Sequence, residues 1–199
     1  MSHASADEVE TEIRAQLKRA RDVGFEPTHL DSHMGTLFAT PQFLERYIKV
    51  GIENKIPVMF PGGHNTMIIQ QLSSPNLQEQ LKQTGLMLWN AGLPVLDDLH
   101  NVSYGFDYPK NKELAKSEIQ KFATSKYIET IRTLKPGLTM VIMHCTAPTE
   151  IFKYVSDSGR TREGDLLAMT DPAFKKFIQD EKIILTTWRE VKERRAKVK

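Results

Sequence analysis

The chain has 199 residues, 40% hydrophobic and 26% charged, which is enough to bury the core of one globular domain. Its formal net charge is only +2, so bulk electrostatics give no reason to expect a nucleic-acid or membrane partner. A single cysteine, a polar N-terminus unlike a signal peptide, and apolar runs well short of the roughly 20 residues of a membrane span together predict a cytoplasmic protein.

Helix start signals and apolar spacing define the elements predicted for the first half of the chain. Ser5 followed three residues later by Glu8 has the spelling of a capping box. Thr40 before Pro41 gives a good cap and a favourable first helical residue. We predict, in order, a helix between residues 5 and 24, a strand over 28–32, a helix from residue 41, a strand over 57–60, a helix over 76–91 and a strand over 93–98.

The second half continues this alternation. We predict a helix near 112–134, a strand over 138–144, a polar loop around Arg160 and Arg162, a helix over 171–180, a strand over 183–188 and a closing basic helix. Apolar strands alternating with amphipathic helices indicate an α/β fold with a mainly parallel sheet, either open or closed into a barrel. No composition shift marks a second domain, so residues 1–199 are predicted to form a single α/β domain.

Ionisable side chains recur where the predicted strands end. In "THLDSHMGT", residues His29, Asp31 and His33 alternate, and alternate side chains of an extended run point to the same side. The carboxyl ends of parallel strands form one edge of a sheet or barrel, where ligands usually bind. The other strand-end candidates are His64 in "PGGHN", Asp97 and Asp98 with His100 just beyond, and His144. Because they recur on successive strands, we predict that these side chains line one common site.

These residue types suggest particular chemistry, although each has a simpler structural reading. His33 with Asp31 on the same face suits zinc or another divalent metal, or acid–base catalysis. His144 ends an apolar strand and is a second functional candidate, whereas a lone strand-end histidine is more often a hydrogen-bonding residue. Cys145 lacks a catalytic cysteine signature and is interpreted as a plain buried thiol. Arg160 could bind an anionic substrate or pair with acidic groups.

Several common motifs are missing from the sequence. There is no P-loop, no dinucleotide-binding glycine fingerprint, no Gly-x-Ser-x-Gly elbow and no Cys-x-x-Cys pair. Nucleotide-driven chemistry and serine hydrolysis are therefore not favoured.

With "THLDSHMGT", the later "VIMHCTAP" and the C-terminal "IILTTWRE", the chain resembles the YdjC-type carbohydrate deacetylases along nearly its whole length. The resemblance implies a deformed (β/α) barrel that binds one divalent metal, Mg or Zn, and removes an acetyl group from a small N-acetylated carbohydrate by metal-activated water. His33 matches the second metal histidine, and His144 matches the late active-site histidine that can protonate the leaving amine. Asp31 would orient the ligand or contact substrate, and we assign His64, Asp97 and Arg160 to substrate binding.

The sequence departs from the family pattern in its first part. The opening strand with adjacent aspartates and the strand with the first metal histidine have no counterpart here, so the barrel is predicted to be incomplete at the N-terminus. The chain is then a C-terminal fragment, a shortened homologue completed by a partner chain, or a non-catalytic relative with a sugar-binding cleft. Exposed sheet edges would favour a homo-oligomer.

Three functions follow from these observations. The first is a metal-dependent carbohydrate deacetylase-type hydrolase, supported by His33 and His144 at strand ends. The second is a non-catalytic sugar-binding or regulatory remnant, supported by the missing aspartate pair. The third is a barrel enzyme of the sugar isomerase or endonuclease kind, which would need more carboxylate ligands than Asp31, Asp97 and Asp98.

Overall fold

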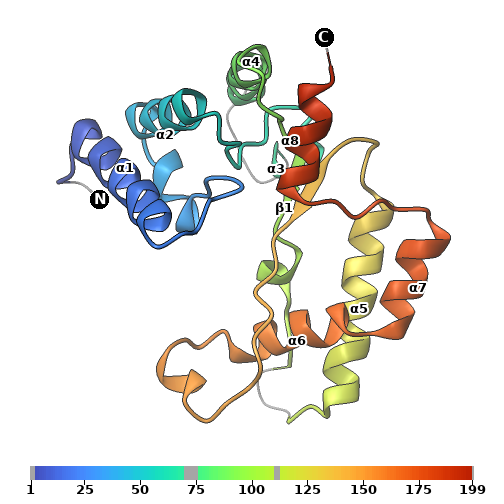
Figure 1. The fold of residues 1–199 in the computed structure, drawn as a ribbon. Coiled ribbons are helices and arrows are strands. Elements are labelled where there is room, and N and C mark those ends of the chain that lie inside the picture. The colour runs from blue at the N-terminus through green and yellow to red at the C-terminus, as the bar shows by residue number, and fades with distance from the viewer. Residues whose placement is uncertain (1–2, 70–75, 110–112, 199) are drawn as a thin grey trace. The chain divides into compact units, whose positions relative to one another are not determined.

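The computed structural model describes residues 3–69, 76–109 and 113–198 (Figure 1). It is an α/β structure, rich in helix, with a small parallel sheet. Within the described residues, every helix is too short or too polar to cross a lipid bilayer. The chain divides into two compact units, which are described separately. The first unit comprises Met1–Asn65, Leu72–Asp97 and Thr186–Lys199, and the second comprises Thr66–Gln71 and Asp98–Leu185.

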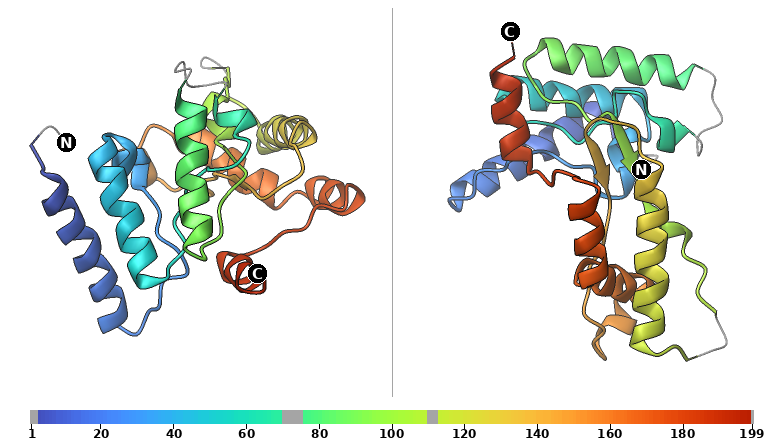
Figure 2. Two further views of the ribbon diagram at one scale, coloured as in Figure 1. Left: turned by 90° about the horizontal axis from the view of Figure 1, so that it is seen from above. Right: turned by 90° about the vertical axis from the view of Figure 1, so that its right-hand side faces the viewer.

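The helices predicted for the first half of the chain begin within one residue of their predicted starts. The capping box is present: the Glu8 N–H donates to Ser5 Oγ at 3.2 Å, and the Ser5 N–H donates to Glu8 Oε2 at 2.8 Å. Thr40 Oγ1 accepts the N–H of Phe43 at 3.1 Å. The helical elements are α1 (Ala6–Asp22), which packs on α2 (Pro41–Asn54), the 3-10 helix η1 (His33–Phe38), α4 (Leu77–Asn90) and α8 (Trp188–Ala196) (Figure 2).

The first unit's predicted strands are reduced to short parallel bridges. Leu30 pairs with Val58, and Pro61 pairs with Leu96. The Leu30 N–H donates to the Pro57 carbonyl, and the Met59 N–H donates to the Leu30 carbonyl, both at 2.8 Å. The sequence therefore predicts the position and parallel direction of these segments correctly but overestimates their length.

Tyr47 anchors this pairing to the hydrophobic core of the first unit. Its ring is fully buried together with Phe60 and Leu88, and α2 and α4 thus share one core with the extended segments. The Tyr47 hydroxyl donates to the Leu30 carbonyl at 2.7 Å, which satisfies a phenol that burial removes from water.

In the second unit, two short strands form a parallel pair. Strand β1 (Asp98–His100) pairs with β2 (Thr139–Val141) in the register Asp98 to Thr139 and His100 to Val141. The predicted strand over 138–144 is thus confirmed over its first part. The other elements are α3 (Thr66–Ile69), the 3-10 helices η2 (Val102–Gly105) and η3 (Phe152–Tyr154), α5 (Lys116–Arg132), α6 (Gly159–Met169) and α7 (Pro172–Asp180).

Helices α5, α6 and α7 pack together around the core of the second unit (Figure 1). Tyr127 and Ala123 of α5 are fully buried, and they cluster with Ala168 of α6 and with Phe174 and Phe177 of α7. The predicted start of α5 at residue 112 lies outside the described residues.

Helix α6 corrects the prediction of a polar loop around Arg160 and Arg162. Both arginines lie in its first turns. The face that α6 buries consists of Gly164, Asp165 and Ala168, two small residues and one acidic residue. Hydrophobic periodicity does not reveal a helix of this kind, because its buried face carries almost no large apolar side chain.

The predicted strand over 183–188 is also wrong. Ile184 and Leu185 are 83% and 78% exposed, and Thr187 is the N-cap of α8 with Trp188 as its first residue. The described residues provide no neighbouring strand for this segment. β-branched residues favour strands only when a partner covers them, so the composition alone was misleading.

Candidate functional site

His144 lies just beyond β2 in the second unit, with three defined contacts. Its ring stacks on Tyr104 of η2 with centroids 5.7 Å apart and planes at 27°. Its backbone N–H donates to Asp165 Oδ2 at 2.8 Å, and its carbonyl accepts the Thr146 hydroxyl at 3.1 Å. Both the main chain and the ring of this predicted catalytic residue are therefore fixed.

Asp165 is the acidic residue that sequence reasoning missed. It is fully buried and accepts hydrogen bonds from the hydroxyls of Tyr127 at 2.6 Å and Ser103 at 3.1 Å, as well as from His144. Burial, followed by the hydrogen bond to Asp165, raises the pKa of the Tyr127 phenol. The only sequence signal was an aspartate three residues before an alanine, inside a stretch interpreted as loop.

Cys145 is exposed, so its interpretation as a buried thiol is wrong. Partial desolvation and then the nearby charge of Asp165 raise the pKa of its thiol. Both effects disfavour the thiolate, which is the nucleophilic form of cysteine. The raised pKa therefore does not favour Cys145 as a nucleophile.

The carboxyl end of β1 presents a second histidine. Burial lowers the pKa of His100, and the negative charge of Asp98 partly opposes that effect. Asp98 itself is fully buried and accepts the backbone N–H groups of Met67 and Leu99. Asp98 therefore holds the start of α3 against β1.

In the first unit, Asp31 and His33 both lie exposed directly after the bridge at Leu30. Asp31 Oδ1 accepts the N–H of Ser32 at 2.6 Å, and His33 is the first residue of η1. The chain then turns through two left-handed residues, Met34 (φ 53°) and Gly35 (φ 69°). The extended run on which the shared-face prediction depends therefore ends at His33.

His29 has a different environment. Its ring stacks on Trp188 of α8 with centroids 4.9 Å apart and planes at 14°. Burial lowers the pKa of its imidazole, with a smaller opposing effect of Asp31. The stacked ring of His29 thus holds α8 against the segment before Leu30 in the first unit.

The loop that carries His64 is fastened to the backbone beside Asp97. The N–H groups of Gly62 and Gly63 donate to the Leu96 carbonyl at 3.0 and 3.1 Å. A Cβ atom on Gly63 would lie 2.4 Å from the Asp97 Cα, so only glycine permits this approach. The structure therefore brings together the segments of two predicted substrate-binding residues.

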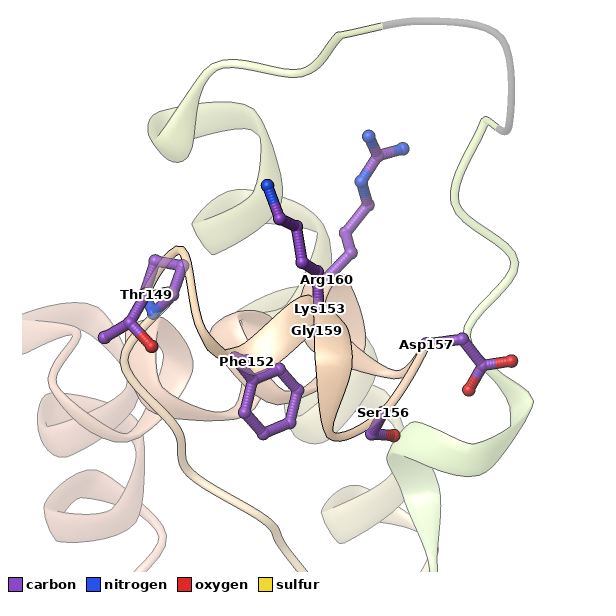
Figure 3. A pocket seen from close by; sticks show the side chains of 8 residues that line it. Thr149, Phe152, Lys153, Ser156, Asp157, Gly159 and Arg160 are labelled. Atoms are coloured by element: carbon purple, nitrogen blue, oxygen red, sulfur yellow. The ribbon is translucent and has the colours of Figure 1, made fainter.

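Arg160 lines a small pocket in the second unit. Its guanidinium donates to the Pro109 carbonyl at 2.9 Å, and its side chain extends to the same side as that of Lys153 (Figure 3). The pocket has a volume of about 240 Å³. Its lining consists of Pro148, Thr149, Phe152, Lys153, Ser156, Asp157, Gly159 and Arg160.

The predicted site residues are divided between the two units. Asp31, His33, His64 and Asp97 belong to the first unit, and His144 and Arg160 belong to the second. Within the described residues, no three histidine, cysteine, aspartate or glutamate side chains are grouped so that they could hold a metal ion. Catalytic zinc usually takes three protein ligands, so these residues alone do not fit a complete site.

Comparisons with a family model and with known proteins point to the same family. The model of the YdjC-like protein family matches residues 1–180. A carbohydrate deacetylase of Thermus thermophilus is 26% identical over 190 residues, which cover 96% of this chain and 62% of the relative. A carbohydrate deacetylase of Brevibacillus brevis is 25% identical over 191 residues, covering 94% and 63%. The chain thus spans less than two thirds of the length of these relatives.

The fold has a solved counterpart as well. A crystal structure from Enterococcus faecalis, described as that of a candidate cellobiose-phosphate cleavage protein, superposes with a TM-score of 0.68. The sequences are 16% identical, and the match covers 96% of this chain and 62% of that chain. The family match over most of the sequence confirms the resemblance seen in its motifs, and the chain belongs to the YdjC-like family.

Proposed function

We propose that this chain forms all or part of a carbohydrate deacetylase-type hydrolase, which removes an acetyl group from an N-acetylated sugar. The observation that carries the proposal is the YdjC-like match over residues 1–180, together with curated relatives named carbohydrate deacetylases. The name of the structural neighbour also refers to a saccharide. A barrel-like closure of the parallel segments is part of this proposal.

His144 is the proposed proton donor. Amide hydrolysis releases an amine, which must receive a proton as the carbon–nitrogen bond breaks. An imidazole is the side chain that enzymes most often use to pass a proton to or from a reacting group. The contacts of His144 with Tyr104 and Asp165 support this role, because a general acid must be held in a fixed orientation.

His33 is the proposed metal ligand, with Asp31 beside it as an orienting or substrate-contacting group. A Mg or Zn ion is the group that the family resemblance implies. The described residues do not provide a complete set of ligands, so the proposal requires further ligands from outside them. We therefore assign no catalytic step to the ion from this structure.

Metal binding is tested by elemental analysis of the purified protein beside His33→Ala and the control His3→Ala. His3 is an exposed histidine near the N-terminus. We expect bound divalent metal in the parent and in the control, and loss of most of it in His33→Ala, because removing a ligand weakens an exposed site. Equal metal content in all three proteins would exclude His33 as a ligand.

Deacetylation is tested by acetate release from N-acetylated chito-oligosaccharides with added Mg or Zn. We expect His144→Gln to lower kcat by about 100-fold or more, the usual contribution of a general acid. His3→Gln should leave the rate unchanged. An unchanged rate of acetate release in His144→Gln would contradict the assigned role.

A non-catalytic sugar-binding protein is the second candidate. The observation that favours it is the incomplete set of metal-ligating side chains among the described residues. Calorimetry with the same oligosaccharides separates the two functions. Saturable binding without acetate release supports the second candidate, and neither binding nor release contradicts both.

A further inference from the structure

Asp165 is a buried acidic group that the proposed chemistry uses neither as an acid nor as a metal ligand. Its carboxylate lies on α6, is fully buried, and accepts three hydrogen bonds: from the Tyr127 hydroxyl at 2.6 Å, the Ser103 hydroxyl at 3.1 Å and the His144 N–H at 2.8 Å. A buried carboxylate without partners would be strongly destabilising. These three donors from α5, η2 and the end of β2 offset that cost and join the elements at one point.

Helix α6 holds the segment after β2 at two places. The His144 N–H donates to Asp165 Oδ2 at 2.8 Å, and the Thr146 N–H donates to the carbonyl of Arg162, also in α6, at 3.3 Å. The Thr146 hydroxyl closes a local turn by donating to the His144 carbonyl at 3.1 Å. The backbone at His144 and two residues beyond it is therefore tied to the same helix.

The chemistry of this cluster suits an ionised acceptor. A carboxylate only accepts hydrogen bonds, and each of its three partners is a donor. Burial and Asp165 together raise the pKa of Tyr127, so the phenol keeps its proton and remains a donor. An asparagine of the same shape carries no charge and turns its N–H₂ group toward one of these partners, which weakens the arrangement with little change in volume.

We propose that Asp165 is a positioning residue for His144: its buried carboxylate fixes the main chain at the end of β2 so that the imidazole is held against Tyr104. The catalytic consequence of this inference rests on the proposed function, whereas its geometric content does not. Tyr104 contributes from the other side, because its ring is the surface on which the imidazole lies.

The first test is nuclear magnetic resonance of the full chain, with Asp165→Asn beside the parent. In the parent, the Tyr104 ring current should displace the His144 ring-proton signals, and Tyr104→Leu should abolish that displacement and so assign it. In Asp165→Asn we expect the displacement to be reduced, because a weaker, uncharged acceptor then holds the main chain at His144. The His144 amide should also exchange with solvent about tenfold faster or more, because its charged acceptor is gone.

A matched control is available in the same unit. Asp171 caps α7 by accepting the Ala173 N–H at 2.9 Å, and it accepts the Thr124 hydroxyl of α5 at 2.7 Å. Asp171→Asn should lower stability but leave the His144 signals and amide exchange unchanged. An unchanged His144 in folded Asp165→Asn, or the same disturbance in both variants, would overturn the proposal.

A second variant covers the case in which Asp165→Asn does not fold. Tyr127→Phe removes the partner of Asp165 Oδ1 and leaves the bond to His144 in place. We expect the His144 amide to exchange several-fold faster in this variant, because the Asp165 carboxylate loses its shortest hydrogen bond. Unaltered exchange there would equally contradict a positioning role.

Kinetics then separate this inference from the proposed function. If the parent releases acetate, Asp165→Asn should lower kcat by about tenfold or more with KM nearly unchanged, because it displaces the proton donor and not the sugar. If the parent is inactive, the proposed function fails while the magnetic resonance result still decides the positioning role.

Discussion

Replacing Gly62 with alanine is expected to lower the free energy of unfolding of the first unit by about 3 kcal/mol. A Cβ atom at this position would lie 2.5 Å from the Cα of Gly85 in α4 and 2.8 Å from a methyl group of Val95. The nearer obstacle is backbone, which cannot rotate away as a side chain can, so α4 must shift from the loop. Urea unfolding followed by tryptophan fluorescence measures the effect, since Trp89 and Trp188 both belong to this unit.

Gly24→Ala is the matched control for this prediction. Gly24 has φ of 80°, but its added Cβ would meet no atom within 4 Å. Its substitution should cost about 1 kcal/mol, which isolates the left-handed backbone conformation from steric conflict. Equal losses in the two variants would show that the close approach of Gly62 and Gly85 does not limit packing.

The sequence predicted most accurately the features that depend on local chemistry. Ser5 with Glu8 and Thr40 with Pro41 start helices because each cap satisfies N–H groups of its own first turn. No distant residue is needed for that bond. The predicted helix over 171–180 also begins at a local cap, where Asp171 accepts the Ala173 N–H.

Features that depend on distant partners were predicted less well. The face that helix α6 buries inside the second unit consists of two small residues and one acidic residue. Its sequence therefore lacks the apolar stripe that marks a helix. Residues 183–188 have strand composition, but the described residues give them no partner. Propensity describes the residue alone, whereas a strand also requires a neighbour.

The candidate site divides in the same way. His33 and His144 were proposed because each stands at the end of a predicted strand. Asp165 was not, since its partners Tyr127 and Ser103 are brought to it only by the packing of α5 and η2. A side chain that positions another carries no mark in its own sequence environment.

Phe60 connects the core of the first unit to the loop that carries His64. Its ring is fully buried and lies 6.2 Å from the ring of Phe38, within the cluster that includes Tyr47 and Leu88. The next residue, Pro61, pairs with Leu96 and begins the glycine-rich turn. Packing of this one aromatic ring therefore supports both the core and the base of the loop.

Phe60→Ala is expected to lower the free energy of unfolding of the first unit by about 3–5 kcal/mol, because the lost apolar contact is compounded by the cavity that remains. Phe25→Ala removes the same atoms from a side chain that is 62% exposed, and it should cost less than about 0.5 kcal/mol. Urea unfolding monitored by tryptophan fluorescence again reports on this unit. Similar midpoints for the two variants would mean that Phe60 is not part of a close-packed core. A large loss confined to Phe60→Ala would instead establish that the loop bearing His64 begins beside a close-packed core residue.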